Sequence, residues 1–271
     1  MIYLFLWVKS TRIKTKNFGP IPKDAADQYG DPNFVAMMMA KVICVQLVSM
    51  LGYNILFQDV DMIWYQHPLQ FFDTHQIDMN QYDIIFQDDG GRSTRYAPYS
   101  ANTGFYYVRY NERTRHFLTS LFMTGDVILS THSHQQVMIA LLKEHVSRFG
   151  LKVKVLGRDT DEFPGGFHYH QRSKIYMKSL FAGKTKPYIF HMSWTLNKDN
   201  KVLFFRQMGE WYVHEKCIQN SAMIDENRSE HYTASECCSI EPIFSCHYRD
   251  KPSIKPCYSS PSIDKNRQSW W

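Results

Sequence analysis

The pattern of apolar positions first predicts a long helix over residues 34–51. Asp31 is of a type that caps helices, Pro32 suits the first helical turn, and Gly52 suits the end of a helix. Apolar residues lie nearly all the way round this helix, so we expect it to be buried. Its only charged residue is Lys41. A buried ammonium group needs an anion, and the helix by itself favours a structural carboxylate over a ligand phosphate.

Beyond this helix, short apolar runs alternate with helical patterns. A helix is predicted over residues 113–123, and Ser133 with Gln136 has the form of a capping box that opens another helix ending near Gly150. The strand-like runs are residues 53–57, 82–86, 104–108, 153–156 and 188–190. This alternation predicts an α/β domain with a mostly parallel sheet.

Composition and charge narrow the class of protein. Of the 271 residues, 44% are hydrophobic and 15% are aromatic, which is enough for a core and excludes a wholly disordered chain. The net charge of +5 is spread along the sequence and forms no basic stripe, so we expect no nucleic-acid partner. The length allows one large domain, or one domain with an appendage.

The N-terminal segment is apolar over residues 1–8 and polar afterwards. A signal peptide would open with a basic region and end at a small-residue cleavage site, and neither feature is present. No uninterrupted apolar run in the chain approaches the roughly 20 residues that span a bilayer. We expect residues 1–8 to form a buried strand or the stub of a longer element, and residues 9–33 to be loop. We therefore treat residues 1–30 as a separate stub.

Five of the six cysteines lie near the C-terminus: Cys217, Cys237, Cys238, Cys246 and Cys257. The surrounding segment is rich in proline and lacks apolar periodicity, so residues 220–271 are predicted to form a cysteine-rich, irregular tail. Disulfides there would indicate an oxidising compartment, and a glycosylation sequon at Asn227 favours the same location. The alternative is a zinc site, with ligands among Cys237, Cys238, Cys246, His247 and Cys257. No C-x-x-C pair supports it.

Asp59 and Asp61 carry the sharpest chemical signal. They follow the strand-like run of residues 53–57, and ligands of open α/β sheets bind at the carboxyl ends of strands. Two hard oxygen donors at such a place can hold Mg²⁺ or Mn²⁺ and leave positions open for substrate phosphates. A cation there would neutralise the charge that develops on a diphosphate leaving group.

A D-x-D triplet also occurs in calcium-binding loops and in phosphatases. An EF-hand is excluded, because no D-x-D-x-D-G run follows. A phosphatase with a nucleophilic aspartate carries D-x-D after a strand, as this chain does. The next acidic pair, Asp88 and Asp89, comes only 27 residues after Asp61. So short a segment leaves little room for the architecture of such a phosphatase.

An ordered series of segments resembles one known family. In chain order the segments are Lys41, Leu51–Asp61, Trp64, His67–Leu69, Ser100–Arg109 with its N-x-G-F core, His134–Gln136, Phe163–Gly166, His191–Trp194, Lys198 and Lys201. Together they cover about residues 31–215 and resemble the nucleotide-diphospho-sugar transferases. Within these they resemble glycosyltransferase family seventy-seven, which contains plant and algal cell-wall xylosyl-, arabinosyl- and galactosyltransferases. The ordered series is much more specific than any one segment.

The resemblance implies both a fold and an activity. The fold is a GT-A-like, Rossmann-related mixed sheet flanked by helices over residues 31–219. The activity is retaining transfer of a hexosyl or pentosyl unit from a nucleotide-diphosphate donor, a UDP-sugar, to a glycan or glycoprotein acceptor such as a cell-wall polysaccharide. The implied cofactor is Mn²⁺, with Mg²⁺ as the substitute.

The resemblance also assigns roles to individual residues. The metal ligands are Asp59, Asp61 and His191. The contacts to the nucleotide and its diphosphate are Lys41, Asp59, Asp61, Lys198 and Lys201. The residues facing the donor sugar or the reacting centre are Asn102 and Gln135. To these we add Asp88 as a candidate catalytic carboxylate, since it lies in an acidic, glycine-rich loop after a strand.

Two departures from the family pattern affect the interpretation. His134 stands where the family usually has an aspartate, which leaves the identity of the donor sugar open. Only 40 residues precede Lys41, so the usual N-terminal half-unit and membrane anchor are expected to be missing from this chain. With such an anchor the protein would be a type II membrane protein of the Golgi or secretory-pathway lumen. A non-catalytic domain that binds glycans or a protein partner is the remaining alternative.

Overall fold

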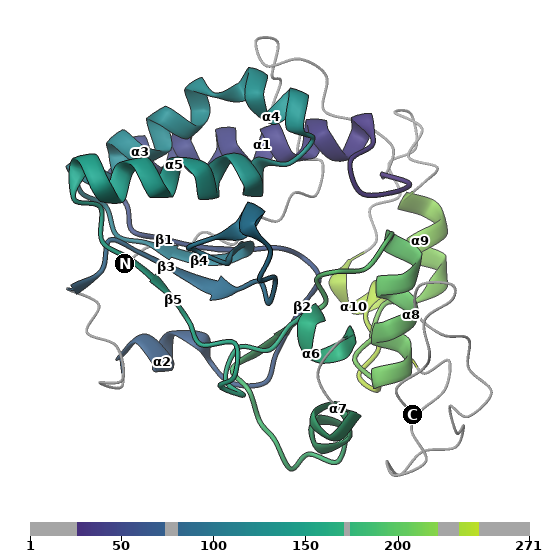
Figure 1. The fold of residues 1–271 in the computed structure, drawn as a ribbon. Coiled ribbons are helices and arrows are strands. Elements are labelled where there is room, and N and C mark those ends of the chain that lie inside the picture. The colour runs from purple at the N-terminus through teal and green to yellow at the C-terminus, as the bar shows by residue number, and fades with distance from the viewer. Residues whose placement is uncertain (1–25, 74–80, 171–173, 222–232, 244–271) are drawn as a thin grey trace. The chain divides into compact units, whose positions relative to one another are not determined.

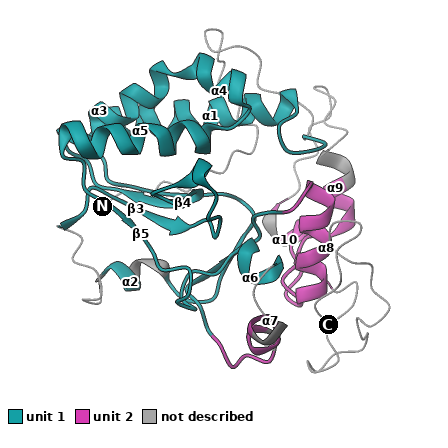
Figure 2. Ribbon diagram, in the orientation of Figure 1, with its two compact units in different colours: residues 1–172, 186–194 teal, residues 173–185, 195–271 magenta. Residues whose placement is uncertain are grey.

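The computed structural model describes residues 26–73, 81–170, 174–221 and 233–243. They belong to two compact units, unit 1 from residues 1–172 and 186–194 and unit 2 from residues 173–185 and 195–271 (Figure 2). The elements of unit 1 are α1 (Pro32–Met50), β1 (Ile55–Gln58), β2 (Met62–Trp64), α2 (Pro68–Asp73), β3 (Ile84–Asp88), the 3₁₀ turn η2 (Thr94–Tyr96), β4 (Ala101–Val108), α3 (Glu112–Met123), α4 (Gly125–Thr131), α5 (His134–Phe149), β5 (Val153–Val155), α6 (Gly166–His170) and β6 (Ile189–His191). Those of unit 2 are α7 (Lys174–Phe181), α8 (Lys198–Met208), α9 (Glu215–Ser221) and α10 (Ala234–Cys237).

The main sheet is mixed. Its strands run in the order β1-β4-β3-β5, with β4 antiparallel to both neighbours and β5 parallel to β3. The predicted mixed sheet flanked by helices is therefore confirmed, whereas the mostly parallel sheet that the alternation suggested is wrong. The physical reason lies in the connection from β3 to β4, which holds only the short turn η2. Without a crossover helix the chain reverses, and the next strand pairs antiparallel.

Both faces of the sheet are buried, because successive side chains of a strand point to opposite faces. Ile84 and Phe86 of β3 join the core under the layer of α1, α3, α4 and α5 (Figure 1). Ile85, between them, joins a second, aromatic core on the face that carries α2. All eight residues of β4 are buried, as expected of a central strand covered on both sides.

Helix α1 begins and ends close to the predicted places. The Asp31 side chain accepts a hydrogen bond from the Phe34 backbone N–H at 2.7 Å, and Gly52 follows the helix with a φ of +82°. The expectation that α1 is buried all round is wrong, because one face packs on the sheet while Leu47 and Met50 are largely exposed.

Among the described residues, α1 alone has the length and mean hydropathy (1.7) to cross a bilayer, with Lys41 interrupting its apolar run.

A two-stranded sheet joins distant parts of unit 1. Strand β2 pairs antiparallel with β6, and Met62 lies opposite His191. Asp61 immediately precedes β2, and its carbonyl accepts a hydrogen bond from the Met192 N–H at 3.0 Å. This pairing brings the end of the D-x-D triplet to the histidine 130 positions later in the chain.

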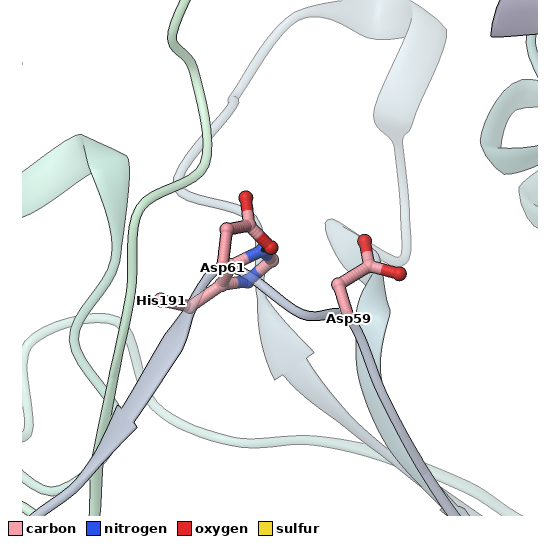
Figure 3. Close-up of side chains that lie close together, drawn as sticks. All are labelled: Asp59, Asp61 and His191. Carbon is pink, nitrogen blue, oxygen red and sulfur yellow. Dashed lines mark ion pairs between the residues drawn. The ribbon is translucent and has the colours of Figure 1, made fainter. Parts of the chain in front are cut away.

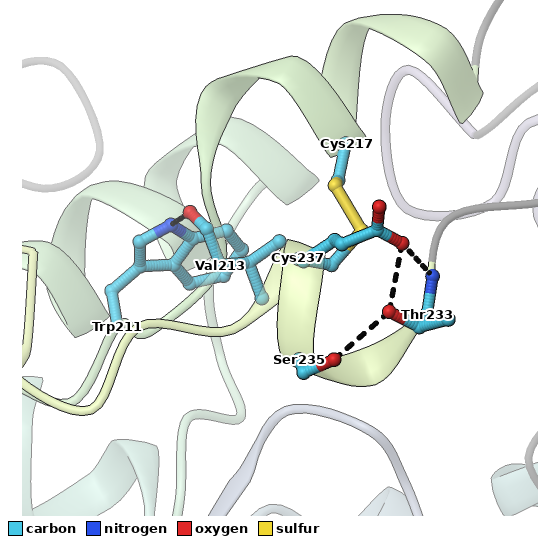
Figure 4. The surroundings of a disulfide bond; sticks show 7 residues. Trp211, Val213, Cys217, Thr233, Ser235 and Cys237 are labelled. Atoms are coloured by element: carbon cyan, nitrogen blue, oxygen red, sulfur yellow. Dashed lines mark hydrogen bonds between the residues drawn. A yellow bond between two sulfur atoms is a disulfide. The ribbon is translucent and has the colours of Figure 1, made fainter.

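Unit 2 contains a disulfide between Cys217 on α9 and Cys237 on α10 (Figure 4). Strand-like pairing of Val213 with Cys238 holds the same segments together. The disulfide confirms a cysteine pair near the C-terminus and removes Cys237 from the alternative zinc site. The other candidate ligands after Cys238, the Asn227 sequon and residues 1–25 lie outside the described residues, and the predicted boundary at residue 220 stays a prediction.

Candidate functional site

Asp59 and Asp61 lie directly after β1, at the edge of the main sheet. The Asp59 N–H donates to the carbonyl of Gly104 at 2.7 Å, which continues the pairing of β1 with β4 into the D-x-D triplet. Asp61 is buried and turns toward β6, where its carboxylate lies 3.4 Å from Nε2 of His191. The ligating atoms of Asp59, Asp61 and His191 all lie within 4.8 Å of one another (Figure 3).

Gly104 makes room for this group of three side chains. A Cβ at position 104 would collide with the imidazole of His191 and lie 2.8 Å from a carboxylate oxygen of Asp59. The glycine of the N-x-G-F segment is therefore required by the close approach of the two side chains. Two carboxylates and one imidazole suit a divalent first-row metal such as Mn²⁺, so the residues present fit the implied cofactor.

Lys41 reaches this group from α1. Its ammonium group forms an ion pair with Asp59 at 2.7 Å and lies over the ring of Phe57 at 5.2 Å from the centroid. The ammonium group of Lys41 thus meets a carboxylate, and that carboxylate belongs to the candidate metal group. The contact between Lys41 and a nucleotide, which the resemblance implied, stays a prediction.

An irregularity in the sheet places the next candidates. The register of β3 against β4 shifts between Phe86 and Gln87, so that Gln87 lies opposite Asn102. Such irregularities redirect side chains and are frequent beside active sites. Next to the shift, Oδ1 of Asn102 accepts a hydrogen bond from the Gly104 N–H at 2.7 Å.

Asp89 is a carboxylate that the sequence did not single out. It is 7% exposed, and it accepts hydrogen bonds from Asn102 Nδ2 at 2.9 Å, Gln135 Nε2 at 3.1 Å and the Trp194 indole N–H at 3.2 Å. All three donors are uncharged, and within the described parts of the chain no Lys or Arg side chain forms an ion pair with it. Asp89 therefore brings Asn102 and Gln135 together around one buried carboxylate group.

Asp88, the carboxylate that the sequence favoured, has different partners. It accepts two hydrogen bonds from the Arg92 guanidinium, at 2.8 and 2.7 Å, and one from the Gly90 N–H. Its charge is thus paired at the end of β3, where the Asp88 side chain is 10% exposed and the Arg92 side chain is 48% exposed. The sequence showed the acidic pair, but nothing in it distinguished which member pairs with an arginine and which accepts only uncharged donors.

Trp194 is held in an unusual backbone conformation. Its φ of +65° lies in the left-handed region, which is strained for a bulky residue and is characteristic of functional sites. Gly166 packs so closely that a Cβ there would collide with the Ser193 carbonyl. The F-P-G-G segment therefore supports the segment that carries His191 and Trp194, and directs the indole toward Asp89.

His134, Lys198 and Lys201 are the remaining residues that the sequence singled out. His134 begins α5 and is buried; burial and the charge of Lys41 hold the pKa of His134 well below its ordinary value, so its imidazole is neutral at pH 7. Lys198 and Lys201 lie on α8 in unit 2. Their contact with a diphosphate stays a prediction.

The sequence matches a known family of enzymes. The family model of the nucleotide-diphospho-sugar transferases matches residues 4–205, and the chain belongs to this family. A particular relative is the UDP-galactose:fucoside alpha-3-galactosyltransferase of Dictyostelium discoideum, which is 26% identical over 230 residues. The match covers 78% of this chain but only 34% of that protein, so the chain spans about a third of its relative. No solved structure matches the chain.

Family membership indicates the class of chemistry. The family is one of nucleotide-diphospho-sugar transferases, which favours a glycosyltransferase over the phosphatase. Membership of glycosyltransferase family seventy-seven and a plant or algal relationship remain predictions.

Proposed function

We propose that this chain is a metal-dependent, retaining glycosyltransferase that moves a sugar from a UDP-sugar to a glycan or glycoprotein. The observation that carries the proposal is the meeting of Asp59, Asp61 and His191 above Gly104, within a family that uses nucleotide-sugar donors. The name of the Dictyostelium relative makes UDP-galactose the first donor to test and favours a hexosyl over a pentosyl unit. Bound Mn²⁺ or Mg²⁺ would neutralise the diphosphate leaving group.

The residues of the chain would supply the other contacts. Asp89 is held in one orientation by three uncharged donors, so its carboxylate oxygens can also accept hydrogen bonds from hydroxyl groups of the donor sugar. Positive charge develops on the sugar as the diphosphate leaves, and a preorganised carboxylate stabilises such charge. Asn102 and Gln135 would act through Asp89, since both amide groups donate to it.

Lys41 would exchange its partner when donor and metal bind. It forms an ion pair with Asp59, whose carboxylate the metal would share. The ammonium group would then be available to a phosphate of the nucleotide, with Lys198 and Lys201 as further cationic contacts. Retention of the anomeric configuration requires that the acceptor attack from the face that the diphosphate leaves, or that a covalent intermediate form. The proposal includes both routes.

The proposed location is the lumen of the secretory pathway, in the Golgi. The Cys217–Cys237 disulfide supports an oxidising compartment, where such bonds form and persist. An anchor outside this chain would make the whole protein a type II membrane protein.

Calorimetric titration of UDP, with and without Mn²⁺, tests the donor site directly. We expect UDP to bind only with Mn²⁺, and binding to fall at least about 100-fold in an Asp61→Ala variant, because removing one charged ligand weakens the metal and the diphosphate with it. Asp126→Ala is the matched control, since Asp126 is exposed in the first turn of α4. Metal-independent binding, or equal binding by Asp61→Ala, would contradict the proposal. Glycan binding that survives loss of both Asp59 and Asp61 would support the non-catalytic alternative.

A further inference from the structure

Gln87 is a buried side chain that none of the proposed roles includes. It lies on β3 at the register shift and is 1% exposed. Its amide nitrogen donates to the backbone carbonyls of Phe163 at 2.9 Å and Pro164 at 3.0 Å. Because two carbonyl oxygens face this end of the amide, the nitrogen must point to them, and the orientation of the amide is determined.

The other end of the amide therefore determines the state of His191. Oε1 of Gln87 lies 2.8 Å from Nδ1 of His191, and an amide oxygen can only accept. Nδ1 must carry the hydrogen, so a neutral imidazole has no hydrogen on Nε2. That bare nitrogen faces Asp61 and lies among the atoms grouped with Asp59.

The surrounding backbone keeps Gln87 and His191 in register. The His191 N–H donates to the Pro164 carbonyl at 3.1 Å, and Gly165 forms a parallel bridge with His191. A Cβ on Gly165 would lie 3.2 Å from the His191 carbonyl and 3.4 Å from Nε2 of Gln87. The close packing of these segments explains why a glycine follows Phe163 and Pro164.

We propose that Gln87 is a positioning residue of the metal site, holding His191 as the tautomer whose Nε2 can coordinate the metal. The inference rests on the proposed metal role of Asp59, Asp61 and His191. A ligating histidine commonly donates its second ring N–H to a neighbouring acceptor, and loss of that acceptor typically lowers metal affinity 10- to 100-fold. Gln87 supplies such an acceptor from a strand that carries none of the three ligands.

The tautomer is measured first, in the metal-free protein. Long-range proton–nitrogen NMR spectra of protein labelled with ¹⁵N-histidine distinguish the two tautomers, and a His191→Gln variant identifies the signals of His191. We expect the Nδ1–H tautomer in the unchanged protein, and a mixed or Nε2–H population in Gln87→Leu. An Nε2–H tautomer in the unchanged protein would overturn the inference, whether or not Gln87→Leu folds.

Metal affinity is measured next, by titrating Mn²⁺ and following the electron paramagnetic resonance signal of the free ion. We expect Gln87→Leu to bind Mn²⁺ about 10- to 100-fold more weakly than the unchanged protein. Gln46→Leu is the matched control, because Gln46 is also a buried glutamine but donates to Thr119 on the helical face. We expect its Mn²⁺ affinity to be unchanged.

The two measurements separate this inference from the proposed function. If the unchanged protein binds no Mn²⁺, the proposed metal role fails, while the NMR spectrum still decides whether Gln87 sets the tautomer. If the unchanged protein binds Mn²⁺ and Gln87→Leu binds it equally well, the metal role stands and the role of Gln87 is overturned.

Discussion

Two neighbouring carboxylates show how strongly the surroundings of a single residue decide its chemistry. Asp88 is paired with the Arg92 guanidinium at the end of β3, so its charge is balanced by the arginine. Asp89 is buried among three uncharged donors, which determine the orientation of its carboxylate. The proposal therefore assigns the contact with the sugar to Asp89, and the catalytic role of Asp88 stays a prediction of the sequence.

Replacing Asp89 by asparagine tests this assignment. We expect Asp89→Asn to lower kcat/KM for sugar transfer at least about 100-fold, because the negative charge is lost and the new amide meets three N–H donors. Affinity for UDP with Mn²⁺ should change less than about threefold, since Asp89 is not among the three grouped ligands. Donor turnover and calorimetric titration measure the two quantities.

Asp88→Asn is the matched control for that change. It makes the same substitution at the adjacent position but removes only the ion pair with Arg92 at the end of β3. We therefore expect turnover to fall less than about tenfold. A larger loss in Asp88→Asn than in Asp89→Asn would reverse the assignment.

At the scale of elements, Asp83 lies just before β3 and links this strand to the start of α3 and to the segment before β5. Its buried carboxylate accepts hydrogen bonds from Arg113 and Asn111 at the start of α3, and from the Lys152 N–H before β5. Burial by itself would raise the pKa of Asp83, but the hydrogen bonds from Arg113, Lys152 and Asn111 outweigh it and bring the pKa to about 2.

This lowered pKa predicts how unfolding depends on pH. The pKa of Asp83 in the folded protein lies below its ordinary value of 3.8, so the unfolded chain takes up the proton first as the pH falls. The contribution, about 2 to 3 kcal/mol, is complete at neutral pH and is lost between about pH 5 and pH 2. Urea unfolding at pH 7, 5 and 3.5 measures it.

Asp83→Asn should remove that pH dependence. We expect the variant to be about 3 kcal/mol less stable at pH 7, since Arg113 and Arg109 lose the buried carboxylate with which they form ion pairs, and to lose less stability on acidification. Equal acid sensitivity in the variant would show that other carboxylates are responsible.

At the scale of the whole molecule, the chain contains two compact units that are stabilised differently. Unit 1 has two hydrophobic cores, one on each face of the main sheet. Unit 2 has short helices, and a disulfide links α9 to α10 across a sequence separation of 20. Closing such a loop stabilises the folded state mainly by restricting the unfolded chain.

Removal of the disulfide should therefore weaken unit 2 alone. We expect Cys237→Ser to cost about 3 kcal/mol and to speed amide hydrogen exchange in peptides from α8 and α9, with little change in β4. Cys238→Ser is the matched control, because Cys238 is exposed and free. Uniform exchange changes across both units would contradict this separation.

Much of the fold could be predicted because its signals are local. Asp31 and Gly52 delimit α1 through contacts within a few residues, and the strands of the main sheet correspond to apolar runs. The direction of β4 could not be predicted this way, since pairing depends on whether the connection contains a crossover helix. The exposure of one face of α1 could not be predicted either, because apolar composition does not say how much of a helix its neighbours cover.

The sequence by itself determined the kinds of residue at the site and their order along the chain. The reason is that the D-x-D triplet after a strand, and each of the segments that follow it, is a local pattern of residues. Only the tertiary structure decided which of them meet. Gln87 and His191 are separated by 104 positions, and their hydrogen bond arises from the register of β3, the packing of Gly165 and the pairing of β2 with β6. Such contacts depend on side-chain direction and long-range pairing, which no local pattern encodes.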